Sequence, residues 1–296
     1  MKLFSFIIVV ILFSTSCSNI DHPVDKTKLY SYDYRLFQGT PVWPLAKAAH
    51  YEDMASVKKI LSASPQLANI PDSVYGNTML MMAIINQDYD LFKLLIDNGA
   101  NFNYHNTYDG SSPIIEACSY REYDSKFVKD LVAKGANVND TTDNAPYAQS
   151  SPLMEAAGCG NSSIVEYLIK EGADINYRNN FGATPLGESI LTEKYDVALI
   201  LLNSGADFSS PIYNSVDRHG RPTLPVKLPE ALRDAMIDLW TIKYYRKRKL
   251  IKFLKTKGID YDSVPIPDYI IDMAKEQYPS TWKEYLKKIL IMLYLC

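Results

Sequence analysis

The chain has 296 residues, and 47% of them are apolar, which is enough to bury a substantial core. Its formal net charge of −3 at pH 7 argues against a general nucleic-acid-binding protein. The four cysteines, Cys17, Cys118, Cys159 and Cys296, have unrelated spacings, which argues against a disulfide framework and a zinc site. We expect Cys118 to be a buried thiol, with a Cys118–Cys159 bridge as the alternative in an oxidising compartment.

The first 16 residues, MKLFSFIIVVILFSTS, predict a secretory signal peptide. A single Lys2 precedes an apolar run that reaches Phe13, which is too short to span a bilayer comfortably, and small residues follow. Ser14-Thr15-Ser16-Cys17 resembles a bacterial lipoprotein cleavage box, although a leucine is usual where Ser14 stands. The resemblance implies lipidation of Cys17 and anchoring in a cell-envelope membrane or periplasm; a plain signal cleaved nearby is the alternative.

Residues 17–40 have no clear hydrophobic period. They begin polar and then become aromatic, with Tyr30, Tyr32, Tyr34 and Phe37. We interpret them as a tether that ends by packing on the following domain, while the alternating tyrosines leave a short strand as the alternative.

Residues 41–262 contain a repeated pattern of short helix pairs. The first helices start in register at Leu80, Ile114, Leu153 and Leu186, and a small residue follows three positions later: Ala83, Ala117, Ala156 and Ser189. Each pair ends in a glycine followed by Ala and then Asn or Asp, at Gly99, Gly135, Gly172 and Gly205, which are 36, 37 and 33 residues apart. An earlier unit fits at Leu45, Ala48 and Ala49. Such small pairs cannot bury their own apolar faces, so they must stack.

The start of each unit is Thr184-Pro185-Leu186 or a near match: Thr78-Met79-Leu80, Ser112-Pro113-Ile114 and Ser151-Pro152-Leu153. With the glycine closures, these motifs resemble the ankyrin repeat over Leu45–Ser209. The resemblance implies an all-α solenoid of about six helix pairs with short hairpin loops. We expect Leu80, Ala83, Leu95, Ala117, Leu131, Ala156, Leu168 and Leu201 to be buried in it.

Three segments depart from the repeat pattern. Extra residues lie around Arg121–Ser125 and in Asp140–Ser150, and a longer insertion, Ser209–Val226, has three prolines and cannot be helical throughout. Insertions in a solenoid fall in loops, so each is either part of a binding face or a neutral surface loop.

The end of the chain predicts one more, enlarged helix pair at Leu228–Trp240 and Lys249–Lys257, followed by a C-terminal capping helix within residues 263–296. Residues 243–257 hold eight basic residues and no acidic one. We interpret this basic run as the solvated outer face of the terminal repeat, with contact to anionic lipid headgroups as the alternative.

The search for catalytic motifs finds none. His22, His50, His105 and His219 are far apart in the sequence, and no HExxH, Gly-x-Ser-x-Gly, P-loop or dinucleotide-binding motif occurs. We therefore predict a protein that is not an enzyme and has no cofactor or metal. An unrecognised hydrolase site in Ser209–Val226 is the alternative from another class.

The resemblance implies a protein-binding role for the concave face of the solenoid. Three classes of residue are carried over to it. The first class is the residue after each hairpin tip: Asn77, Ser111, Ser150 and Ala183. The second class is the last two residues of each first helix: Ile85, Asn86, Ser119, Tyr120, Gly158, Cys159, Leu191 and Thr192. The third class is at the hairpin tips: Tyr104, His105, Tyr108, Tyr177, Arg178, Asn179 and Phe181. Aromatic residues beside small polar ones are typical of contact surfaces.

The predicted function is thus a non-catalytic, exported and lipid-anchored scaffold that binds another protein. An inhibitor or immunity protein for an exported toxin or enzyme is a narrower alternative. A membrane-surface organising protein that uses the basic run 243–257 is an alternative from a different class.

Overall fold

A computed structural model describes residues 20–120, 124–143, 149–216, 221–234 and 241–290. Within these residues the chain forms a stack of six helix pairs, which confirms the predicted ankyrin-like solenoid. The pairs, numbered repeats one to six, are α1 (Trp43–His50) with α2 (Met54–Ala63), α3 (Met79–Ile85) with α4 (Tyr89–Asp97), α5 (Pro113–Cys118) with α6 (Ser125–Ala133), α7 (Pro152–Cys159) with α8 (Ser162–Lys170), α9 (Pro185–Leu191) with α10 (Tyr195–Asn203), and α11 (Leu228–Asp234) with α12 (Ile242–Thr256).

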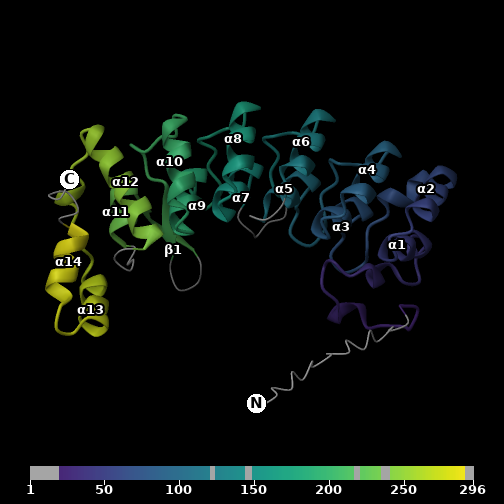
Figure 1. Ribbon diagram of the computed structural model, residues 1–296, viewed down its shortest axis with the longest axis horizontal. Coiled ribbons are helices and arrows are strands. Elements are labelled where there is room, and N and C mark those ends of the chain that lie inside the picture. Colours follow the sequence, from purple (N-terminus) through teal and green to yellow (C-terminus); the bar gives the residue numbers. More distant parts are fainter. Residues whose placement is uncertain (1–19, 121–123, 144–148, 217–220, 235–240, 291–296) are drawn as a thin grey trace, which may run out of the picture.

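The six pairs form an arch (Figure 1). The second helices α2, α4, α6, α8 and α10 lie along its convex side, and the first helices α1, α3, α5, α7 and α9 lie beneath them. We call the face made by the first helices and the loops that precede them the concave surface. Short 3₁₀ turns, η1 (Lys26–Lys28), η2 (Tyr34–Phe37), η3 (Pro65–Asn69) and η4 (Tyr261–Ser263), complete the irregular parts.

Polar caps explain where the helices begin. Ser151 and Thr184 accept hydrogen bonds from the backbone amides of Met154 (3.3 Å) and Gly187 (3.1 Å), as expected for Ser/Thr-Pro helix starts. Ser112 does not cap in this way; its hydroxyl donates to Asp140 at 2.5 Å. The second helices of repeats one to four begin instead at Asp or Asn caps: Asp53, Asp88, Asp124 and Asn161.

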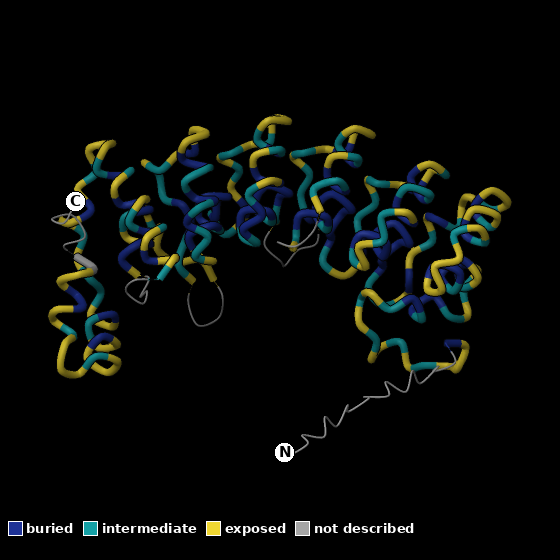
Figure 2. Tube along the Cα trace, viewed as in Figure 1, coloured by how far each residue is buried: buried dark blue, intermediate teal, exposed yellow. Residues whose placement is uncertain are grey.

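The core lies between the two helix layers and runs through all six repeats (Figure 2). All eight residues expected in it, Leu80, Ala83, Leu95, Ala117, Leu131, Ala156, Leu168 and Leu201, are fully buried. Small residues in the first helices let neighbouring first helices approach, and the larger side chains of the second helices fill the layer between repeats. Cys118 is part of this core, and neither it nor Cys159 forms a disulfide; the Cys159 Sγ donates to the Ser119 carbonyl at 2.7 Å.

Hydrogen bonds from asparagine side chains also join the loops of successive repeats. Asn69 donates to the Gly99 carbonyl (3.1 Å) and accepts from the Asn101 amide (2.6 Å). Asn139 makes the same pair of bonds to Gly172 (3.2 Å) and Asp174 (2.7 Å). The closures at Gly99 and Gly172 therefore do more than stop helices, because each offers backbone groups to an asparagine of the preceding repeat.

The insertion after repeat five folds into a β-hairpin, β1 (Tyr213–Val216) paired antiparallel with β2 (Pro222–Val226). The prediction that this segment is not helical throughout is confirmed. The start of the hairpin docks on α9, where the Ile212 carbonyl accepts from the Thr184 amide (2.9 Å). Gly187 permits this approach, since a Cβ at that position would overlap the Ile212 carbonyl oxygen.

Both ends of the chain differ from a plain solenoid. The predicted single C-terminal helix is instead a pair, α13 (Asp268–Gln277) and α14 (Trp282–Leu290), with a small cluster of Ala274, Tyr285 and Leu286 separate from the main core. Pro279 lies between the two helices and forces the break. At the other end, residues 20–40 pack on repeats one and two through buried Leu36 and Phe37, with turns rather than the alternative strand.

Candidate protein-binding surface

Four of the predicted contact residues are buried and contribute to the fold instead. They are Asn77, Ser111, Asn179 and Ala183, at 3%, 7%, 7% and 4% exposure. Asn179 accepts from the amides of Phe181 (3.0 Å) and Ala183 (2.9 Å) and so closes its own loop. Asn77 accepts from the side-chain amide of Asn106 at 3.1 Å and so joins two loops. Short polar side chains in tight loops form hydrogen bonds within the fold, so little of their surface is left for a partner.

Most of the predicted contact residues at the loop tips already make contacts within the chain. His105 bonds to the Gly110 carbonyl through Nδ1 (2.7 Å), and its Nε2 lies 3.4 Å from Asp140. Tyr108, although exposed, packs edge to face on Tyr75 with 5.3 Å between ring centroids. Tyr177 donates to the Gln149 carbonyl at 3.4 Å, and Arg178 donates to the Gly182 carbonyl at 2.7 Å. Tyr104 and Phe181 are half-buried.

Two adjoining hollows lie on the concave surface of repeats three to five. One, of about 330 Å³, is lined by Asp109, Ser111, Glu116, Ser119, Tyr120, Thr142, Ser150 and Glu155. The other, of about 400 Å³, is lined by Ser150, Met154, Glu155, Gly158, Cys159, Asn179, Glu188 and Thr192. Together we call them the acidic groove, because carboxylates at Asp109, Glu116, Glu155 and Glu188 line it. The structure thus brings Ser111, Ser119, Tyr120, Ser150, Asn179 and Thr192 together there. Ile85 and Leu191 do not line it, and Asn86 lies in repeat two.

The three glutamates of the acidic groove all have raised pKa values. Burial, followed by repulsion from Asp109 and Glu155, raises the pKa of Glu116 to about 7. Burial also raises the pKa of Glu155, against the hydrogen bond from Ser150, and the pKa of Glu188, which Glu155 repels. Charge repulsion therefore links the three glutamates across three successive repeats.

Sequence reasoning missed these glutamates, although a signal exists. Each stands two residues after the first-helix register residue: Glu116 after Ile114, Glu155 after Leu153 and Glu188 after Leu186. A recurrence of one charge at one repeat position marks a row on one face of a solenoid.

The concave surface of repeats one and two is covered by the chain itself. Residues 20–40 lie under α1 and α3 (Figure 1). Lys47 of α1 pairs with Asp21 of this segment. Asn86 at the end of α3 donates to the Tyr32 carbonyl at 3.1 Å, and Tyr75 donates to the Leu29 carbonyl at 2.8 Å. The predicted contact residue Asn86 therefore holds an internal segment.

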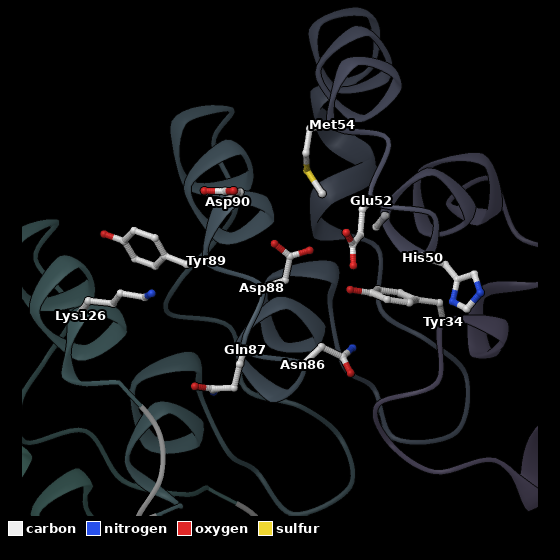
Figure 3. A pocket seen from close by; sticks show the side chains of 11 residues that line it. Tyr34, His50, Glu52, Met54, Asn86, Gln87, Asp88, Tyr89, Asp90 and Lys126 are labelled. Atoms are coloured by element: carbon white, nitrogen blue, oxygen red, sulfur yellow. The ribbon is translucent and has the colours of Figure 1, made fainter. Parts of the chain in front are cut away.

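A cavity of about 630 Å³ lies where this segment meets repeats one to three (Figure 3). The Tyr34 hydroxyl points towards Glu52 and Asp88, while the His50 ring lies on the far side of Tyr34. Burial and the nearby Asp88 raise the pKa of Tyr34. Asp88 also caps α4 by accepting from the Leu91 amide at 2.9 Å. Tyr34 packs in the core and Asp88 caps a helix, so we assign this cavity a structural role.

The basic run 243–257 is not a uniformly solvated face, which corrects the expectation. Lys247 is 2% exposed, and burial followed by repulsion from Arg233 lowers its pKa to about 7. Lys243 pairs with Glu193 of repeat five, and Arg246 lies 3.4 Å from Asp196. Part of the run therefore packs repeat six on repeat five, which leaves fewer cations for a membrane surface.

Other predictions fall outside what the structure can address. Cys17 and the signal segment lie outside the described residues, as do Cys296 and residues 121–123 and 144–148 of the two loop insertions. Within the described residues, no helix is long and apolar enough to cross a membrane. The same residues hold no group of three or more His, Cys, Asp or Glu that could bind a metal ion.

A family model described as ankyrin repeats matches residues 45–142 and 121–211, more than half of the chain. Curated relatives include a homolog of transient receptor potential cation channel subfamily A member 1 from Caenorhabditis elegans, 30% identical over 160 residues. That match covers 54% of this chain and 12% of the relative. The human neurogenic locus notch homolog protein 1 is 33% identical over 139 residues, 47% of this chain and 5% of the relative.

A putative ankyrin repeat-containing protein from Treponema pallidum (strain Nichols) is 27% identical over 124 residues. The match covers 42% of this chain and 40% of the relative. The chain therefore spans well under half the length of each of these relatives, and what it shares with them is the repeat region.

Proposed function

Because the chain belongs to the ankyrin-repeat family, we propose that it is a non-catalytic scaffold that binds another protein on the concave surface of repeats three to five. One observation carries this proposal. The concave surface of repeats one and two is covered by residues 20–40, whereas the same surface in repeats three to five is hollowed into the acidic groove. Among the described residues, the chain supplies a covering segment for repeats one and two and none for the acidic groove.

The groove has features that suit a protein partner. Tyr120 is 51% exposed at its edge, and Ser150 and Thr192 offer small polar groups beside it. An exposed aromatic residue beside polar groups is typical of contact surfaces. The groove is long and shallow and is shared by three repeats, which fits an extended partner better than a small molecule.

Site-specific photo-crosslinking in the native host tests this proposal. A photoreactive residue at Tyr120 or Thr192, on the groove, is compared with one at Glu166 or Lys170, on the exposed side of α8. We expect the groove positions to capture a protein that the α8 positions do not capture. Capture of the same protein from α8 alone would contradict the concave surface as the binding site.

We further propose that the chain is exported and anchored through a lipid on Cys17. The apolar segment before Cys17 and the lipoprotein-like box support this. The test is metabolic labelling with a fatty acid in a bacterial host, with Cys17→Ala as the comparison. Equal labelling of both forms, or absence of both from the membrane fraction, would contradict the anchor.

A further inference from the structure

One position of the repeat, two residues after the register residue of the first helix, can be compared across the first five repeats. It is occupied by Lys47, Met82, Glu116, Glu155 and Glu188 in turn. In repeat one, Lys47 pairs with Asp21 of the covering segment, and in repeat two Met82 is fully buried. In repeat one this position is therefore complementary in charge to the segment that covers it, and in repeat two it belongs to the core.

Repeats three to five hold carboxylates at the same position. Glu116, Glu155 and Glu188 line the acidic groove with Asp109 from the preceding loop. Among the described residues, no lysine, arginine or histidine forms an ion pair with any of these three glutamates. Half-buried carboxylates that repel one another are costly unless a cation faces them. The groove thus presents carboxylates that no cation among the described residues neutralises.

We propose that the acidic groove binds an extended basic segment of a partner protein, with one arginine or lysine opposite each of repeats three, four and five. This rests on the proposed function and names the chemistry of its partner. Packed helices lie about 8–10 Å apart, so equivalent carboxylates recur at about that spacing. A polyproline II segment advances about 9 Å in three residues and returns every third side chain to the same face. A cation at every third residue therefore meets successive glutamates.

Arginine suits these positions better than lysine. Its planar guanidinium donates two parallel hydrogen bonds to a carboxylate and is less strongly hydrated than an ammonium group. The covering segment shows that this surface accepts irregular chain: Asn86 and Tyr75 bind its backbone carbonyls in repeat two. Thr192 and Tyr120 line the corresponding stretch of the open half.

Fluorescence anisotropy with a labelled peptide of four Arg-Pro-Pro units and the full-length chain tests the proposal. The comparison variant carries Glu116→Gln, Glu155→Gln and Glu188→Gln. We expect it to bind the peptide at least about tenfold more weakly, as the product of three modest ion-pair effects. Binding to the unchanged chain should weaken as salt is raised.

The matched control removes the same charge elsewhere. Glu166→Gln, Glu171→Gln and Glu276→Gln change three exposed carboxylates outside the groove. We expect this control to keep the affinity of the unchanged chain within about twofold. Equal weakening in both variants would show non-specific attraction and would overturn the proposal, as would no binding by the unchanged chain. Circular dichroism confirms that each variant is folded, and Glu155→Gln alone serves if the triple variant is not.

Peptide controls test the spacing. A peptide of the same composition with its four arginines adjacent should bind several-fold more weakly, and a Glu-Pro-Pro peptide should not bind. Equal affinity for both arginine peptides would overturn the predicted register. If groove crosslinks to a partner persist while no arginine peptide binds, the basic-segment inference fails and the proposed scaffold function stands.

Discussion

The concave surface of repeats one and two differs from that of repeats three to five in what covers it. Repeats one and two have the surface covered by residues 20–40, with Lys47 paired to Asp21 and Met82 buried in the core. In repeats three to five no segment of the described residues covers it, and we call this the open half; Glu116, Glu155 and Glu188 stand at the equivalent positions. The helices and the core are alike in both halves, so the difference lies in one surface position of the repeat and in what covers it.

The comparison shows how a solenoid separates stability from recognition. The core between the helix layers depends on positions that are apolar or small in every repeat, such as Ala83, Ala117 and Ala156. Positions that face the concave surface are free to differ between repeats, because neighbouring repeats do not need them for packing. A covering segment and an open groove can therefore coexist on one scaffold.

The largest expected effect comes from loosening the covered half. Phe37→Ala removes a fully buried ring from the covering segment and leaves a cavity against repeat one. We expect a loss of about 3 kcal/mol in the free energy of unfolding, measured by urea denaturation. Tyr30→Ala, which changes a residue 69% exposed on the same segment, is the control and should have a small effect. A negligible effect of Phe37→Ala would mean that the segment is not part of the folded unit.

A smaller loss in the free energy of unfolding is expected where the hairpin docks on α9. Gly187→Ala places a Cβ against the Ile212 carbonyl where the hairpin docks on α9, and we expect a cost of about 1–3 kcal/mol. Gly158→Ala in α7 is the matched control, because its Cβ would meet only the Glu188 Cβ at 4.0 Å. There the better helix propensity of alanine should dominate, with a gain of up to about 1 kcal/mol. The same sign for both variants would contradict the docking.

The open half should also show a pH signature. The folded state holds the Glu116 proton more tightly than the unfolded state, since the pKa rises from 4.5 to about 7 on folding. Its contribution to stability is complete below pH 4.5 and is lost as pH rises through 7. Glu116→Gln should therefore stabilise the protein at pH 8 by about 1–3 kcal/mol relative to the original chain, and much less at pH 4. Thermal unfolding at both values measures this, and a pH-independent difference would contradict it.

Much of the fold could be predicted from the sequence, because packing repeats itself. The register of Leu80, Ile114, Leu153 and Leu186 fixes the first helices, and the glycine closures fix where pairs end. The hairpin after Asp207 could be predicted only as non-helical, because its strands are defined by pairing with each other and by the room that Gly187 leaves.

The candidate site was harder to predict than the fold. Asn77 and Asn179 look like exposed loop residues in the sequence, yet their hydrogen bonds to the backbone or to another loop bury them. The first half of the surface is covered by a segment without periodicity, whose position follows from the packing of Tyr34 and Phe37 in the main core. Sequence alone gives no register for such a segment.

Charge reversal in the open half measures the central claim most directly. Glu116→Lys, Glu155→Lys and Glu188→Lys place in repeats three to five the residue type that repeat one carries at Lys47. Anisotropy with the Arg-Pro-Pro and Glu-Pro-Pro peptides then reports which charge the groove prefers. We predict that the reversed variant loses the arginine peptide and binds the glutamate peptide. Continued binding of the arginine peptide with unchanged affinity would contradict a partner site in the acidic groove.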